Sequence, residues 1–133
     1  FLEVPMAIHE SGQMYLETIY ILSRTKSYVR AIDVGEHLGY SKPSVSRAMS
    51  ILKKDGYVLV DSDGAITLTE SGMEIAQTMY TRHTVLSEML MRLGVDEKTA
   101  TEDACRIEHV ISAASFSAIQ QHMRQALGKR VEE

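Results

Sequence analysis

Apolar residues recur at three- and four-residue spacing through most of the 133-residue chain, which predicts a mainly helical protein. The pattern changes at two short β-rich runs, Tyr57–Val60 and Ala65–Leu68, which flank the turn-forming sequence DSDG. This arrangement predicts a β-hairpin. The predicted helices cover residues 10–24, 30–40, 43–56, 69–94, 95–112 and 115–129.

The second and third predicted helices are separated by a very tight turn. Gly35 is small where two helices would cross closely, Gly39 suits the left-handed end of the second helix, and Val45 supplies an inward apolar anchor. This spacing indicates a helix-turn-helix, although a plain helical hairpin shares it. A hairpin that directly follows the pair gives the order of a winged helix.

The third predicted helix begins at Pro43, which suits a first helical turn, behind a cap at Ser41 or Lys42. Its positive charge contrasts with the formal net charge of −4 of the whole chain. Residues 39–54 contain no acidic side chain, and their basic residues are Lys42, Arg47, Lys53 and Lys54. A local basic stripe is the footprint of a nucleic-acid-binding helix, and a solvated basic helix end is the plainer alternative.

The residue types on this helix suit two kinds of DNA contact. Lys53 and Lys54 suit phosphate oxygens, where they would fix the register and give salt-dependent affinity. Ser44, Ser46 and Arg47 have the chemistry to reach base edges. The sequence therefore predicts that this helix contacts double-stranded DNA.

The second half of the chain is predicted to be helical throughout. The helix over residues 69–94 begins at Thr69, a residue type suited to capping, and is apolar on more than one face. Three helices of this size form a thin core, so we expect a homodimer to cover their remaining apolar surface. We predict a mainly α protein, with a winged helix-turn-helix DNA-binding domain over residues 6–70 and an α-helical metal-binding and dimerisation domain over 71–129.

Composition limits the class of protein. Hydrophobic residues make up 44% of the chain and charged residues 24%, which is typical of a globular protein. A single cysteine cannot form an internal disulfide, which fits a reducing cytosol. No apolar run approaches the roughly 20 residues that a membrane helix needs. We therefore expect a soluble cytoplasmic protein without a membrane partner.

The sequence ACRIEHVI contains that cysteine together with two further residues that bind metals. On the predicted helix over residues 95–112, Cys105, Glu108 and His109 stand at i, i+3 and i+4 on one face and could all reach one ion. Thiolate, carboxylate and imidazole suit iron, cobalt, nickel or zinc. The alternative is that Cys105 is a small buried hydrophobe and that its two neighbours are solvated.

Two other functions compete with a metal-binding regulator. A metal-independent winged-helix transcriptional regulator that responds to another ligand would keep Cys105 in its core. An enzyme would use Cys105 as a nucleophile and His109 as a base. The sequence has no oxyanion-hole segment and no glycine-rich loop to support such chemistry, so we predict that the protein is not an enzyme.

Five segments together resemble the DtxR/MntR family of metal-dependent transcriptional repressors: MYLETIYIL, YSKPSVSRAMSILKKDGYV, LTESG, YTRHTVLSEML and ACRIEHVIS. The resemblance runs in order from about Met14 to Ser112. It implies a metal ion bound between the DNA-binding and dimerisation domains, which fixes a homodimer on a palindromic operator. It also implies repression of metal-ion uptake genes.

The resemblance also implies metal ligands. Met14, Cys105, Glu108 and His109 match ligands of the iron-responsive members, whereas the manganese-responsive members carry Asp and Glu at the first two positions. His83 matches a histidine used by both branches. A carboxylate ligand of the manganese branch is matched by Glu17. Because sulfur donors favour iron(II) over manganese(II), we expect iron(II) first and manganese(II) second, with cobalt, nickel or zinc as surrogates.

The chain departs from the iron-type pattern at two positions. Ser87 and Thr101 stand where iron-type members have a glutamate and a histidine, so their ancillary iron site is not expected here. Instead, Glu17, His83 and a shared Glu108 are expected to form a second site, which makes a binuclear centre. In length the chain resembles the two-domain manganese branch.

On the DNA side, the resemblance adds Ser41 and Pro43 to the contacts proposed for the third helix. With Ser44 and Arg47 they fall where family members approach bases and sugars. Arg47 replaces a glutamine found in some members, and an arginine can read guanine with two hydrogen bonds. We therefore expect a guanine preference at that contact.

Overall fold

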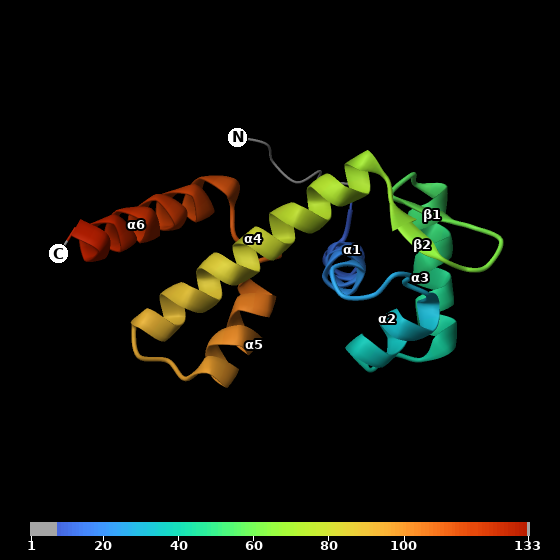
Figure 1. Ribbon diagram of the computed structural model, residues 1–133, viewed down its shortest axis with the longest axis horizontal. Helices are drawn as coiled ribbons and strands as arrows, with labels where there is room; N and C mark the ends of the chain where they lie inside the picture. The colour runs from blue at the N-terminus through green and yellow to red at the C-terminus, as the bar shows by residue number, and fades with distance from the viewer. Residues whose placement is uncertain (1–7, 133) are drawn as a thin grey trace. The chain divides into compact units, whose positions relative to one another are not determined.

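A computed structural model describes the backbone of residues 8–132 and the side chains of residues 8–126. Residues 6 and 7, where the first predicted domain begins, lie outside the described residues, as do the side chains of residues 127–129. The elements in chain order are α1 (Glu10–Ser23), α2 (Ala31–Leu38), α3 (Lys42–Lys54), β1 (Val58–Val60), β2 (Ile66–Leu68), α4 (Glu70–Arg92), α5 (Glu97–Ile107) and α6 (Ala113–Glu132) (Figure 1). The predicted order of helices and hairpin is confirmed.

The helix-turn-helix lies in a first compact unit, which extends to Tyr80. Gly39 ends α2 with φ 73°, and its N–H donates to the Gly35 carbonyl at 2.8 Å. A Cβ on Gly35 would lie 3.4 Å from a methyl group of Val45, which is itself buried. Gly39 thus adopts the left-handed conformation that its position predicted, and Gly35 lies at a close crossing of the two helices. Ser41, and not Lys42, caps α3, because its side chain accepts the N–H of Ser44.

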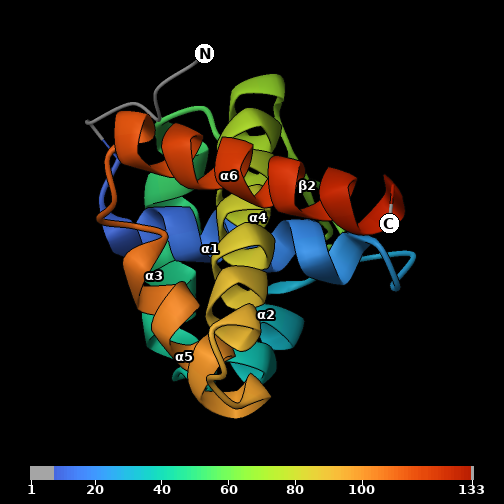
Figure 2. The same cartoon turned by 90° about the vertical axis from the view of Figure 1, so that its left-hand side faces the viewer.

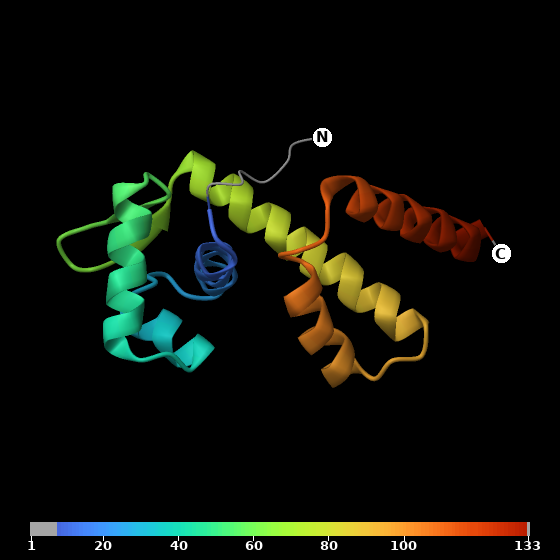
Figure 3. The ribbon, with the colours of Figure 1, turned by 180° about the vertical axis from the view of Figure 1, so that it is seen from behind.

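The wing is a two-stranded antiparallel hairpin that contacts α3 (Figure 3). Val58 pairs with Leu68 and Val60 pairs with Ile66. The carboxylate of Asp61 accepts the N–H groups of Asp63 and Ala65 at 2.8 and 2.9 Å, which closes the turn between the strands. Alternation along β1 buries Val58 and leaves Leu59 exposed, as expected for a sheet with one solvated face.

The first helix and the beginning of α4 complete this unit. Leu16 and Ile19 of α1 are fully buried, and α1 contacts α2, α3 and β2. The rings of Tyr20 and Tyr80 meet edge to face at 5.5 Å. The hydrophobic core of the winged helix is therefore shared by its own helices, the hairpin and α1.

The second compact unit begins at Thr81, within α4, and contains α5 and α6. Leu86 of α4, Ala104 of α5 and Phe116 of α6 form one buried cluster, and the three helices are labelled in Figure 2. Asp96 caps α5 by accepting the N–H of Thr99 at 3.0 Å. The large apolar side chain of Leu93 remains 75% exposed.

The end of α5 differs from the prediction. The apolar spacing predicted a helix through residue 112, but α5 ends at Ile107 with Glu108 as its C-cap. Arg82 donates hydrogen bonds to the backbone carbonyls of Glu108 and Ile111. The Ser112 hydroxyl accepts the N–H of Ser115 at the start of α6. The side chain of Arg82 thus replaces the helical hydrogen bonds that would have continued α5.

Among the described residues, no helix combines the length and the apolar character needed to cross a membrane.

Candidate metal centre and DNA-reading helix

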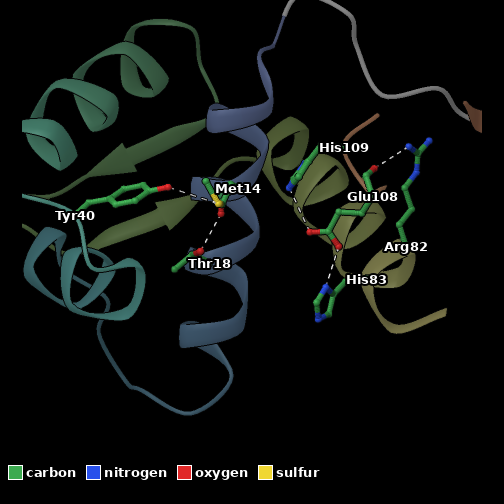
Figure 4. Close-up of polar contacts among 7 residues, drawn as sticks. All are labelled: Met14, Thr18, Tyr40, Arg82, His83, Glu108 and His109. Atoms are coloured by element: carbon green, nitrogen blue, oxygen red, sulfur yellow. Dashed lines mark hydrogen bonds and ion pairs between the residues drawn. The ribbon is translucent and has the colours of Figure 1, made fainter. Parts of the chain in front are cut away.

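The carboxylate of Glu108 is the centre of the candidate metal site, and it has no exposed surface. Its Oε2 lies 3.1 Å from Nδ1 of His83, and its Oε1 lies 3.3 Å from Nε2 of His109 (Figure 4). The side chain of His83 is 24% exposed and that of His109 only 6%. Each carboxylate oxygen therefore faces a different imidazole nitrogen.

Arg82 holds the backbone behind this carboxylate. One guanidinium nitrogen donates to the carbonyls of Glu108 and Ile111 at 3.1 and 2.9 Å, and the guanidinium carbon lies 5.6 Å from the centre of the Phe116 ring. Burial lowers the pKa of Arg82, and the negative charge of Glu108 acts in the opposite direction. Arg82, the residue before His83 on α4, thus holds the segment that carries Glu108 and His109.

This donor set fits a divalent transition metal ion. A buried carboxylate is costly unless cations or hydrogen-bond donors compensate its charge. Two imidazole nitrogens and two carboxylate oxygens are ligand atoms that iron, manganese, cobalt and zinc accept. When bound, the ion would supply positive charge at Glu108, with His83 and His109 as nitrogen ligands.

Cys105 is half-buried on α5. Cys105 lies on α5, Glu108 is the C-cap of that helix, and His109 lies in the following turn. Among the described residues, the thiol does not join Glu108 and His109 in a cluster of ligand atoms all within 4.8 Å of one another. Burial raises the pKa of the Cys105 thiol, Glu108 raises it further, and Arg106 lowers it.

Two further candidate ligands lie on α1, in the first compact unit. Met14 is half-buried and Glu17 is buried, and their spacing of three residues places them on one face of the helix. The Tyr40 hydroxyl lies 4.0 Å from Sδ of Met14, and the Thr18 hydroxyl donates to the Met14 carbonyl at 2.9 Å (Figure 4). The sulfur is therefore in contact with the turn between α2 and α3.

The predicted DNA contacts are all exposed on α3 or at its cap. The Ser41 hydroxyl donates to the hydroxyl of Ser44 at 2.9 Å. Among the described residues, none of the basic side chains of α3 forms an ion pair, which leaves their charge available for phosphate or bases. The exposed residues are Ser41, Lys42, Pro43, Ser44, Ser46, Arg47, Lys53 and Lys54.

Sequence reasoning missed two residues at these sites. Arg82 was passed over although it precedes His83, because periodicity does not reveal that an arginine is buried against carbonyl groups. Tyr40 falls at the end of the predicted helix 30–40, and nothing in the sequence pattern shows that its ring lies on α1. Ser87 is buried and Thr101 exposed, and neither carries an acidic or imidazole group.

Two family descriptions match nearly the whole chain. The family described as "Iron dependent repressor, N-terminal DNA binding domain" matches residues 7–66. The family described as "Iron dependent repressor, metal binding and dimerisation domain" matches residues 69–126.

Known proteins agree with these matches. The chain is 34% identical over 109 residues to the HTH-type transcriptional regulator MntR of Lysinibacillus sphaericus. The aligned region covers 82% of this chain and 78% of that protein. It is 36% identical over 102 residues to the MntR of Geobacillus thermodenitrificans, and the aligned region covers 77% of this chain and 72% of that protein.

Solved structures show the same architecture. The manganese regulator SloR matches 85% of this chain with a TM-score of 0.77 and 25% sequence identity. A manganese-dependent transcriptional repressor in complex with manganese matches 84% of this chain with a TM-score of 0.76 and 29% sequence identity. The chain spans about half the length of these two proteins, 53% and 51%. The chain therefore belongs to the DtxR/MntR family, and it is a metal-dependent DNA-binding transcriptional repressor, not an enzyme.

Proposed function

We propose that this repressor is activated by metal ions bound by six side chains, and the observation that carries the proposal is the buried Glu108 carboxylate. One of its oxygens faces His83 and the other faces His109. Such an arrangement suits a carboxylate that ligates ions on both sides. The proposed ligands are Met14, Glu17, His83, Cys105, Glu108 and His109.

Glu108 is proposed as a ligand shared by two neighbouring ions. Glu17 would complete the site around His83, and Met14 and Cys105 would complete the site around His109. The family resemblance supports this division, because Met14 and Cys105 match iron-type ligands while Glu17 matches a carboxylate of the manganese branch. The binuclear centre is thus a hybrid of the two ligand sets.

Iron(II) is proposed as the physiological metal, with manganese(II) second. Two sulfur donors, Met14 and Cys105, support iron, because softer ligands disfavour manganese. The names of relatives support manganese, since two solved structures are described as a manganese regulator and a manganese-dependent repressor. Cobalt, nickel or zinc would serve as surrogate ions.

The proposed mechanism is linkage between metal and DNA binding. Residues 6–70 would read DNA, and residues 71–129 would dimerise and supply most ligands. Because ligands would come from both parts, the arrangement in which they converge gains the free energy of coordination. If the same arrangement also fits DNA, bound metal raises the affinity for DNA, and bound DNA raises the affinity for metal by the same factor. We propose that the homodimer binds a palindromic operator in the cytoplasm and represses metal-ion uptake genes.

The DNA contacts are proposed to lie on α3. Lys42, Lys53 and Lys54 would contact phosphates, and Ser41, Pro43, Ser44 and Ser46 would approach bases and sugars. Arg47 would read guanine. The support is their exposure and the absence of ion pairs from the basic side chains of α3 among the described residues.

An anaerobic cobalt(II) titration of metal-free protein, beside a Cys105→Ala variant, tests the ligand set. A thiolate-to-cobalt charge-transfer band that is absent from the variant supports Cys105 as a ligand and an iron-type sensor. Cobalt binding without that band would favour manganese at Glu17, His83 and Glu108. No binding at all would overturn the metal centre, and a chelator would then leave DNA binding unchanged.

A further inference from the structure

The phenol ring of Tyr40 connects the first helix to the start of α3. Its hydroxyl lies 4.0 Å from the sulfur of Met14, and its ring meets that of Tyr15 edge to face at 5.9 Å (Figure 4). Both contacts are made to α1, although Tyr40 belongs to the turn between α2 and α3. All these residues lie in the first compact unit.

The backbone of Tyr40 is held to α2. Its N–H donates to the Gly35 carbonyl at 3.1 Å, which fixes the residue to the end of α2. The next residue is Ser41, whose side chain caps α3 by accepting the N–H of Ser44. Tyr40 thus lies between the Met14 sulfur, which its hydroxyl contacts, and the residue that caps α3.

The chemistry of the contact suits an oriented thioether. A thioether sulfur is a weak hydrogen-bond acceptor, and methionine has three rotatable bonds that leave its position poorly defined. A phenol O–H directed at the sulfur occupies one lone pair and favours one rotamer of Met14. The second lone pair then remains for an ion.

We propose that Tyr40 is a positioning residue, which orients the Met14 sulfur for metal binding and ties that sulfur to the N-terminus of α3. This inference rests on the proposed role of Met14 as a ligand. It assigns to Tyr40 both a part of the metal affinity and a part of the coupling between metal and DNA.

The test is a double-mutant cycle with Tyr40→Phe and Met14→Leu, read out as cobalt(II) affinity in competition with a chelator. Phenylalanine keeps the ring on Tyr15 and removes only the hydroxyl. We expect Tyr40→Phe to weaken cobalt binding roughly two- to tenfold, the range for one lost hydrogen bond. The same substitution in the Met14→Leu background is expected to cause no further loss. Tyr28→Phe, an exposed tyrosine of the same unit, is the matched control.

A readout without metal separates orientation from ligation. In metal-free protein, the methyl resonance of Met14, assigned through Met14→Leu, is expected to shift in Tyr40→Phe and to stay in place in Tyr28→Phe. An unchanged resonance in Tyr40→Phe would show that the hydroxyl does not set the position of the thioether.

DNA binding tests the coupling. The probe is a duplex selected from a random pool by the cobalt-saturated wild-type protein. At saturating cobalt, we expect the metal-induced gain in DNA affinity to be smaller in Tyr40→Phe than in wild type. An equal gain would overturn the tie to α3, and an equal loss of cobalt affinity in both backgrounds would overturn the role through Met14. If Met14→Leu alone binds cobalt like wild type, the ligand assignment itself fails, and the role of Tyr40 fails with it.

Discussion

The two functional regions of this chain are built in opposite ways. At the candidate metal centre, the Glu108 carboxylate has no exposed surface and lies within 3.3 Å of an imidazole nitrogen on each side. On α3, the side chains of Arg47 and Lys53 are exposed and form no ion pair among the described residues.

This contrast separates two kinds of energetic consequence. Buried polar groups depend on one another, so the loss of one leaves its partners unsatisfied and affects stability as well as function. Exposed groups already interact with water, so their loss changes binding and leaves the fold intact. Substitutions at the buried centre should therefore change metal binding or stability according to which partner is removed, whereas substitutions on α3 should change DNA binding alone.

Glu108→Gln is expected to have the largest effect. The amide keeps the volume but removes the charge and one of the two oxygens that face the imidazoles, so metal affinity should fall by at least about 100-fold, since even an outer-shell partner contributes roughly 10- to 100-fold. Chelator competition with cobalt(II) or manganese(II) measures this loss.

The exposed Glu102, on the same helix as Cys105, provides the matched control. Glu102→Gln should bind metal like wild type. The metal-free Glu108→Gln protein should remain folded, because a neutral amide is less costly to bury than a carboxylate. Wild-type metal affinity in Glu108→Gln would remove Glu108 from the ligand set.

Arg82→Met should destabilise the fold by about 2–4 kcal/mol, because two backbone carbonyls would lose a charged donor. Chemical denaturation of the metal-free protein measures the free energy of unfolding. Arg92→Met is the control on the same helix, since Arg92 forms a partly exposed ion pair with Glu88 at 3.5 Å. That surface pair should contribute less than about 1 kcal/mol. Equal stability of the two variants would show that the carbonyl contacts of Arg82 do not stabilise the segment.

The same contrast explains how far the sequence could predict the structure. Gly35, Gly39 and Val45 act through local geometry and one helix crossing, and all three lie where their spacing placed them. The exposed basic residues of α3 could be identified from charge alone.

The metal centre was harder to predict because its geometry depends on distant residues. The helical pattern continues through Glu108 and His109, so periodicity gave no sign that α5 ends at Ile107. Beyond this end, the carbonyl of Glu108 accepts a hydrogen bond from Arg82, 26 residues away in the chain. The sequence pattern named candidate ligands but not the side chains that hold them.

Arg47→Ala should reduce discrimination at one base pair of the operator by about 1–3 kcal/mol, the value of a bidentate contact with guanine. Competition binding against duplexes that differ at single positions measures the change. Lys53→Ala is the control, because a phosphate contact carries no sequence information. It should weaken binding to all duplexes alike and lower the salt slope by about 1. Unchanged discrimination in Arg47→Ala would argue against a base contact.

The last prediction concerns the pH dependence of metal binding at Cys105. Burial and then Glu108 raise the pKa of this thiol, so at neutral pH it is protonated and must lose its proton to become a ligand. Below that pKa, wild-type metal affinity should therefore rise by about tenfold more per pH unit than the affinity of Cys105→Ala. The other proposed ligands are present in both proteins, so their contributions cancel when the cobalt(II) affinities of the two are compared from about pH 6 to 8, below the raised pKa of the thiol. Parallel slopes would mean that Cys105 does not ligate the ion, which would leave oxygen and nitrogen donors around Glu108 and shift the expected metal toward manganese.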